Sequence, residues 1–183
     1  MVSAAYFAQV AEDPSYNKYK YEQLDCQGFV EKVLYDSGCR KADGSAYNWR
    51  GSNSMWRNAL SWRGTIAEAV DKFGKIPDGS WAFYVKYDGG EKDRGYNDGD
   101  GNASHVGIYI GGGLVRDSTR STKSNRDGVG LRSISDFNMI GLCKYLDYNT
   151  ENVNNISQIK SILDNIENGI TEIRRVLNEL RTD

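Results

Sequence analysis

Residues 104–111 read Ser-His-Val-Gly-Ile-Tyr-Ile-Gly, and the alternation within them decides the fold that we predict. Val106, Ile108 and Ile110 lie on one face of an extended chain, because successive side chains of a strand point to opposite faces. Three glycines follow as a turn, and a second strand pattern returns over Leu114–Ser118. The stretch therefore predicts two antiparallel strands joined by a glycine turn.

Helical patterns precede these strands in the chain. Apolar residues recur at intervals of three and four where we expect a helix, and at intervals of two where we expect a strand. The expected helices are Ala4–Ala11, about Asp25–Asp36, Ser52–Leu60 and Thr65–Lys72, and the further expected strands are Ser80–Tyr87 and Gly141–Tyr148. Helices first and strands later favour the α+β class, with N-terminal helices packed on an antiparallel sheet.

The composition of the chain changes at about residue 149. Residues 149–183 contain no Trp, Tyr, Phe or Pro, whereas Gly, Trp and Tyr punctuate the segments before them. We therefore divide the chain into a globular domain over residues 1–148 and a C-terminal helix over residues 149–183.

Charge and hydropathy argue against two classes of partner. The net charge of −2, with 26% charged residues, is ordinary for a globular protein, so neither a nucleic acid nor a membrane is expected as a partner. No apolar run approaches the roughly 18 residues that a membrane span needs. Met1–Asp13 lacks the basic region and cleavage site of a secretory signal. We therefore expect a protein made in the cytoplasm without a signal peptide.

The segment 150–181 predicts one long helix with a strict heptad pattern. Its seam residues alternate spacings of three and four, and they are Ile156, Ile159, Leu163, Ile166, Ile170, Ile173, Leu177 and Leu180. Such a seam must be buried, and isoleucine at both core positions favours three or four strands over two. We expect a homo-oligomer of three or four chains through residues 150–181. Folding of the helix back onto its own domain is the open alternative.

Cys26 stands where the second expected helix begins. A helix N-terminus carries partial positive charge, which favours the thiolate over the thiol. Its free backbone N–H groups can also stabilise an oxyanion. The alternative is that Cys26 is a small buried apolar residue, as most free cysteines are. Cys39 and Cys143 have neither a helix start nor a histidine beside them, so we expect inert thiols, and a contact between the two stays open.

His105 is the only histidine in the chain. An imidazole near a thiolate is the usual activator, because its ordinary pKa near 6.5 lets it exchange a proton at working pH. The glycine turn brings Asp117 back beside His105, where a carboxylate can accept from the imidazole and fix its tautomer. The alternatives are a surface or core histidine with no such task, and a solvated strand end for Asp117.

The two motifs resemble a known family. Residues 25–30, Asp-Cys-Gln-Gly-Phe-Val, resemble the Asp-Cys-Ser-Gly-Phe-Val signature of the NlpC-type papain-like cell-wall peptidases. Residues 105–111 are similar to the His-Val-Gly-Ile-Tyr-Ile-Gly strand of that family, and residues 76–83 resemble the Pro-Gly-Asp-Leu-Val-Phe-Phe strand that precedes it. The closing strands resemble phage and prophage versions from Gram-positive hosts. The resemblance covers about residues 4–148.

The resemblance implies an α+β papain-like (NlpC-type) fold followed by the long heptad helix, and a catalytic cysteine peptidase domain over residues 1–148. The implied reaction is hydrolysis of peptidoglycan stem peptides, at the bond between γ-D-glutamate and the following diamino acid, with no metal or other cofactor. Cys26 is then the nucleophile, His105 the base, and Asp117 stands where the family commonly has a histidine. The residues expected to contact substrate are Tyr21, Gln27 and Ser104.

Other functions stay open at this point. A non-catalytic cell-wall binding module is one, since Gln27 replaces the family's serine, and acyl transfer with the same triad is another. The expected setting is a phage or prophage lysin, or a particle-borne protein acting on the bacterial cell wall. A bacterial wall-remodelling enzyme is the alternative. A calcium loop over Asp98, Asp100 and Asn102 is disfavoured, because the Gly and Glu that an EF-hand requires are missing.

Overall fold

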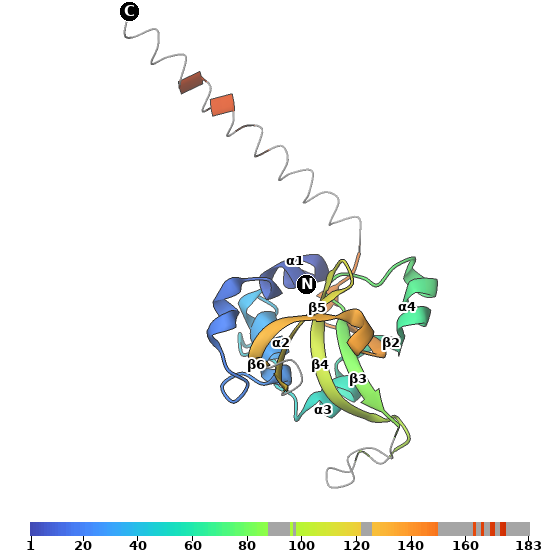
Figure 1. Cartoon of the computed structure of the whole chain (residues 1–183). Coiled ribbons are helices and arrows are strands. Elements are labelled where there is room, and N and C mark those ends of the chain that lie inside the picture. Colours follow the sequence, from blue (N-terminus) through green and yellow to red (C-terminus); the bar gives the residue numbers. More distant parts are fainter. Residues whose placement is uncertain are drawn as a thin grey trace, which may run out of the picture. The chain divides into compact units, whose positions relative to one another are not determined.

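The computed structural model describes residues 1–87, 96, 98–121, 126–149, 163, 166, 169–170 and 173–174. The chain divides into two compact units, Met1–Tyr148 and Asn149–Asp183. The first unit belongs to the α+β class, with helices and an antiparallel sheet in one compact body (Figure 1).

The helices of the first unit are α1 (Ala4–Ala11), α2 (Cys26–Asp36), α3 (Ser52–Asn58) and α4 (Ile66–Phe73), with the short 3-10 helices η1 (Pro14–Lys18) and η3 (Ile134–Asp136). The strands are β1 (Val2–Ser3), β2 (Leu60–Thr65), β3 (Trp81–Lys86), β4 (Asn102–Gly111), β5 (Leu114–Ser121), β6 (Arg126–Ser133), β7 (Met139–Cys143) and β8 (Leu146–Asp147). In the described part of the chain, none of the helices combines the length and apolar character that crossing a membrane requires.

The larger sheet has the order β2-β7-β3-β4-β5-β6, and all its neighbours are antiparallel. Strands β1 and β8 form a separate parallel pair. Helix α2 packs on β4 through a common core that includes Phe29 and Val33 of the helix and Val106 and Ile108 of the strand, all fully buried. Burial of side chains of this size stabilises the fold by about 1.5–3 kcal/mol each. The core thus fixes the helix that begins at Cys26 against the strand that carries the histidine.

Two strands of the larger sheet were not predicted. Strand β2 lies at one edge, and Gly64 is its only fully buried residue. Strand β6 lies at the other edge and reads Arg-Asp-Gly-Val-Gly-Leu-Arg-Ser. Edge strands have one paired side and can carry charge and glycine, so their apolar alternation is weak. The strand expected over Gly141–Tyr148 is interrupted, because β7 ends at Cys143 and β8 begins at Leu146.

The fold prediction is wrong at the C-terminus. We expected a papain-like domain followed by one long heptad helix, and the structure has no such long helix among the elements it describes. Beyond residue 149 it describes, in helical conformation, Leu163, Ile166, Gly169, Ile170, Ile173 and Arg174, and the rest of the predicted seam lies outside the described residues. Leu163 is 53% exposed and Ile173 62% exposed. A heptad pattern specifies a helix only when a partner buries the seam, so the pattern alone was insufficient.

A glycine of β6 determines how closely the chain segment before α2 approaches the sheet. Gly128 has a φ of 121°, and an added Cβ would lie 2.1 Å from the carbonyl oxygen of Tyr19. We expect Gly128→Ala to lower the free energy of unfolding by about 2–4 kcal/mol, because both backbone strain and a steric clash act there. Gly44 also has a positive φ of 80°, with nothing within 4 Å of its Cβ position, so Gly44→Ala should cost only about 1 kcal/mol. Urea unfolding measures both, and equal losses would refute the steric argument.

Candidate active site

Cys26 is the first residue of α2, and its side chain is buried. Asp25 caps the helix, and its Oδ1 accepts a hydrogen bond from the N–H of Gly28 at 2.7 Å. The N–H of Cys26 is among the first-turn groups that the helix itself cannot satisfy. Such a donor, next to the thiol, can stabilise the negative charge on a carbonyl oxygen that the thiol attacks.

His105 lies on β4 beside a β-bulge. Tyr84 of β3 pairs with His105 and Val85 pairs with Ala103, so Ser104 is the additional residue between the two pairs. A bulge changes the direction in which neighbouring side chains point and is common beside active sites. The side chain of His105 is 14% exposed, so a small reactant can still reach it.

The structure brings Asp117 and His105 together, with 2.5 Å between Oδ2 and Nε2. Asp117 is on β5, and its side chain is fully buried. Extending the pairing of β4 and β5 by one residue places Gly107 opposite Asp117, so the imidazole approaches the carboxylate diagonally. An added Cβ at Gly107 would lie only 2.9 Å from the Cβ of Asp117. The same Cβ would lie 2.6 Å from Cγ1 of Val115, so glycine at this position lets β5, and with it Asp117, pack closely against β4.

His105 holds its proton more tightly than a free imidazole. Burial lowers the pKa of His105, but hydrogen bonds to Asp117 and Cys26 outweigh this effect and raise the pKa to about 9. The ring also stacks on Phe137, with ring centroids 5.8 Å apart and an angle of 23° between the planes. Because Nε2 of the imidazole contacts Asp117, Nδ1 is the ring nitrogen that remains available to Cys26. A protonated imidazole in this position favours the thiolate.

Tyr21 lies beside the thiol. Burial, the charges of Cys26 and Asp25 and a hydrogen bond with Cys26 raise the pKa of Tyr21 to about 12, so the hydroxyl keeps its proton at neutral pH. The backbone N–H of Tyr21 donates to Oδ1 of Asp127 at 3.3 Å. The guanidinium of Arg120 lies 5.9 Å from the centre of its ring. Tyr21 is thus placed to donate a hydrogen bond to the thiolate or to a substrate oxygen.

A pocket of about 490 Å³ opens beside the start of α2. The segment before α2, the first turn of α2 and β5 supply its lining residues, which are Tyr21, Glu22, Gln23, Leu24, Asp25, Gly28 and Arg120. Its volume lies within the range of clefts that bind small molecules or short peptide segments. Asp25 and Gly28, on either side of Cys26 in the chain, are among the lining residues, most of which are polar.

Gln27 and Ser104, both expected to contact substrate, are engaged elsewhere. The Nε2 of Gln27 donates to Oε1 of Glu31 at 2.8 Å and to the carbonyl of Trp49. Glu31 in turn accepts from the backbone N–H of Trp49 at 2.6 Å, so Gln27 helps to fasten that segment to α2. Ser104 is exposed, and its hydroxyl donates to the carbonyl of Tyr84 at 3.4 Å. Neither residue lines the pocket beside the start of α2.

Sequence reasoning missed the residues that surround Asp117 and His105. The guanidinium of Arg126 binds Oδ1 of Asp117, and that of Arg132 lies 3.4 Å from Oδ2. Arg132 also lies over the ring of Phe137, 5.1 Å from its centre. The signal for these residues was weak because β6 was not recognised as a strand. Without β6, nothing in the sequence places its arginines beside β5.

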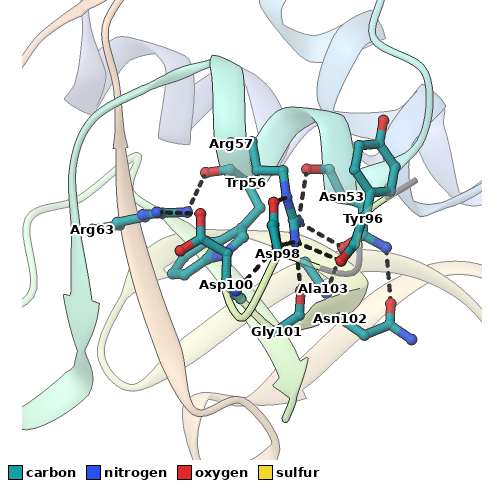
Figure 2. Close-up of polar contacts among 10 residues, drawn as sticks. All are labelled: Asn53, Trp56, Arg57, Arg63, Tyr96, Asp98, Asp100, Gly101, Asn102 and Ala103. Atoms are coloured by element: carbon teal, nitrogen blue, oxygen red, sulfur yellow. Dashed lines mark hydrogen bonds and ion pairs between the residues drawn. The ribbon is translucent and has the colours of Figure 1, made fainter. Parts of the chain in front are cut away.

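Helix α3 fixes the chain just before His105 (Figure 2). Arg57 binds both carboxylate oxygens of Asp98, at 2.7 and 2.6 Å. Oδ1 of Asn53 accepts from the N–H of Ala103 at 2.9 Å. The start of β4 and its bulge are therefore held from the α3 side, two residues before the imidazole.

The three side chains considered as calcium ligands are engaged in contacts within the protein. Oδ2 of Asp100 accepts from Arg63 at 2.7 Å, and Asn102 accepts from the side chain of Asn53 at 2.8 Å. The hydrogen bond from Arg57 holds the pKa of Asp98 well below its usual range. Among the residues that the structure describes, no group of three or more His, Cys, Asp or Glu residues is placed to hold a metal ion.

The other two thiols lie away from the imidazole. Cys39 is buried and its Sγ donates to the carbonyl of Tyr145 at 3.4 Å. Burial raises the pKa of Cys39, and it raises the pKa of Cys143 to about 12. Both cysteines are free. Each therefore stays a protonated and unreactive thiol at neutral pH.

No protein-family model matches the chain, and no curated protein matches it. What the site can do therefore follows from its own geometry. A thiol at a helix start, a hydrogen-bonded imidazole and a buried carboxylate together can form a nucleophile that attacks a carbonyl carbon.

Replacing Gly107 by alanine should separate Asp117 from His105, because the new Cβ would lie 2.9 Å from the Cβ of Asp117. The imidazolium would then be less stable and the thiolate fraction of Cys26 lower. We expect alkylation of Cys26 by iodoacetamide at neutral pH to slow by about tenfold, which corresponds to one pKa unit. Gly112→Ala is the control: nothing lies within 4 Å of its Cβ position, so its positive φ of 58° should lower stability without slowing alkylation. An unchanged alkylation rate in Gly107→Ala would contradict this coupling.

His105 should make folding stability depend on pH. Its pKa is about 9 in the fold and 6.5 as a free group. Because the folded pKa is the higher one, the stabilisation is fully present below pH 6.5 and is lost as the pH rises through about 9. We expect the free energy of unfolding to fall by on the order of 3 kcal/mol over this window. His105→Gln should abolish most of that fall. Urea unfolding of both proteins at several pH values measures it, and an equal fall in His105→Gln would contradict the assignment to His105.

Proposed function

We propose that this chain is a cysteine peptidase with Cys26 as nucleophile, His105 as base and Asp117 as the residue that orients the base. The observation that supports this most is the 2.5 Å contact between Nε2 of His105 and the buried carboxylate of Asp117, together with the influence of Cys26, which helps to raise the pKa of His105. A helix start favours the thiolate, and the buried carboxylate fixes the imidazole tautomer.

In the first half of the reaction, the thiolate of Cys26 attacks the carbonyl carbon of the scissile peptide bond and a C–S bond forms. The carbonyl oxygen becomes an oxyanion, which the N–H of Cys26 stabilises. His105 then gives its proton to the leaving nitrogen as the C–N bond breaks. The products of this half are a free amine and a thioester on Cys26, with His105 left neutral.

In the second half, neutral His105 takes a proton from a water molecule, whose oxygen attacks the thioester carbon. The C–S bond breaks, a carboxylic acid leaves, and the proton on His105 restores the ion pair with the Cys26 thiolate. Asp117 keeps the ring in place through both halves by accepting from Nε2. No cofactor is required by this sequence of steps.

Peptidoglycan stem peptides are the proposed substrates, cut at the bond between γ-D-glutamate and the following diamino acid. Residues 25–30 and 105–111 resemble those of NlpC-type cell-wall peptidases, and this resemblance is the main support. The pocket beside the start of α2 suits such a substrate, because Arg120 and Glu22, an exposed ion pair at 3.6 Å, line it and could exchange their mutual contact for the carboxylate and amine groups of a short peptide.

The proposed setting is the bacterial cell wall, with a lytic enzyme of phage or prophage type. Association of three or four chains through residues 150–181 stays a prediction, since most of that segment lies outside the described residues. Linked catalytic units would gain avidity for an insoluble wall.

Cys26→Ala should abolish the release of new amino groups from purified cell walls, because no other described thiol has an imidazole partner. Cys39→Ala is the matched control, since it removes a buried thiol that has no contact with His105 among those described, and its activity should stay within about twofold of the unchanged protein. Mass spectrometry of digested muropeptides of known structure identifies the bond that is cut. Undiminished release by Cys26→Ala refutes the proposal, and wall binding without any release favours a binding module.

A further inference from the structure

Both oxygens of the Asp117 carboxylate are engaged by cationic side chains. Oδ2 lies 2.5 Å from Nε2 of His105 and 3.4 Å from Nη1 of Arg132. Oδ1 binds Nη2 of Arg126. The side chain of Asp117 has 0% exposure, so water does not share these contacts. One buried carboxylate thus faces an imidazole from β4 and two guanidinium groups from β6.

Arg126 is built into the sheet for this contact. Its side chain lies over Gly130, where an added Cβ would be 2.8 Å from its Cδ and 2.7 Å from its Nη1. Nη1 donates to the carbonyl of Leu131 at 2.9 Å. Its Nε is buried and has no hydrogen-bond partner in the described part of the chain. A buried donor without a partner is unfavourable, so other contacts, above all the ion pair with Asp117, must hold the side chain there.

We propose that Arg126 is a positioning residue for the Cys26–His105 pair and acts on it through Asp117. This inference rests on the proposed cysteine chemistry. By binding Oδ1, the guanidinium leaves Oδ2 aimed at the imidazole. Its positive charge also offsets part of the charge of Asp117, so the carboxylate holds the imidazolium proton less strongly. His105 can then release that proton to the leaving amine and accept another from water.

Several charged or titratable groups lie near this carboxylate and imidazole, and they are Cys26 on α2, Tyr21 before α2, Arg126 and Arg132 on β6, and Asp136 on η3. Arg116 of β5 also acts on Asp117 through its charge, but its guanidinium donates to the carbonyl of Ala11 and to Asn17. Arg132 divides its charge between Asp117 and Asp136, whose Oδ2 lies 3.1 Å from its Nε. Among the described ion pairs, Asp117 is the one acidic partner of Arg126. Of the two arginines, Arg126 therefore acts more strongly on the charge of Asp117, and through it on the proton held by His105.

Removing a positive charge beside a titrating pair makes each of its protons harder to lose. In Arg126→Gln, the titration midpoints of His105 and of the Cys26 thiol should both rise, by about one pH unit. Arg126→Lys keeps the charge but not the planar pair of donors. We expect its midpoints to stay within about 0.3 units of the unchanged protein, while alkylation and turnover become slower.

The single histidine makes the test direct. NMR of the nitrogen-15-labelled imidazole in the full chain gives the midpoint of His105 without overlap. The pH dependence of alkylation by iodoacetamide, followed at the Cys26 peptide by mass spectrometry, gives the midpoint of the thiol. Neither measurement uses a cell-wall substrate, so failure of wall hydrolysis would count against the proposed function alone. Arg63→Gln is the matched control, because it removes a guanidinium from a 2.7 Å ion pair with Asp100.

The proposal expects raised midpoints in Arg126→Gln and unmoved midpoints in Arg63→Gln. If Arg126→Gln does not fold, Arg132→Gln replaces it and should raise both midpoints by a smaller amount. An unmoved or lowered midpoint in the variant that folds overturns the proposal, because a purely structural role would slow reactions without moving the titration. A shift in Arg126→Lys as large as that in Arg126→Gln overturns it as well.

Discussion

A carboxylate taken out of water must be surrounded by donors or cations, and Asp117 imposes this requirement on the centre of the sheet. Its partners are His105 from β4 and the arginines Arg126 and Arg132 from β6, so three adjacent strands must be in register for the charge to be paired. A slip of one residue would turn these side chains to the opposite face. It would leave a buried charge unpaired, at a cost of about 3–5 kcal/mol. The ion cluster and the register of β4, β5 and β6 therefore depend on each other.

The nucleophile is subject to two opposing electrostatic influences. The start of α2 favours a thiolate at Cys26, but the cap of the same helix is the carboxylate of Asp25, which stands next to it in the chain. A negative cap works against a second negative charge nearby. The imidazolium of His105 supplies the compensation, and the packing of α2 on β4 holds the two elements that carry Cys26 and His105 together. Helix α2 therefore positions the thiol of Cys26, and His105 on the sheet makes it reactive.

The sequence predicted those parts of the fold whose signals are local. Helix α1 was predicted with the bounds it has, and the turn that returns Asp117 to His105 follows from three consecutive glycines. Strand β6 was not predicted, because charged residues and glycines at a sheet edge leave no clear alternation of apolar and polar residues. The contacts of the β6 arginines with Asp117 were not predicted either, because they depend on how β6 pairs with β5. The substrate contacts expected of Gln27 and Ser104 stay predictions. The sequence did not show that the side chain of Gln27 binds Glu31 and that the hydroxyl of Ser104 donates to the carbonyl of Tyr84.

The balance of charge around the site bears on how the proposed reaction can proceed in a buried environment. In the resting ion pair, the cations are Arg126, Arg132 and protonated His105, and they face Asp117, Asp136 and the Cys26 thiolate. Formation of the thioester consumes the charge of the thiolate. In the same half-reaction the proton of His105 leaves with the amine, so the positive charge of the imidazolium disappears too. The two arginines then face the two carboxylates, so the charges of these six groups balance both in the resting ion pair and in the acyl-enzyme, and the buried carboxylate of Asp117 keeps cationic partners throughout.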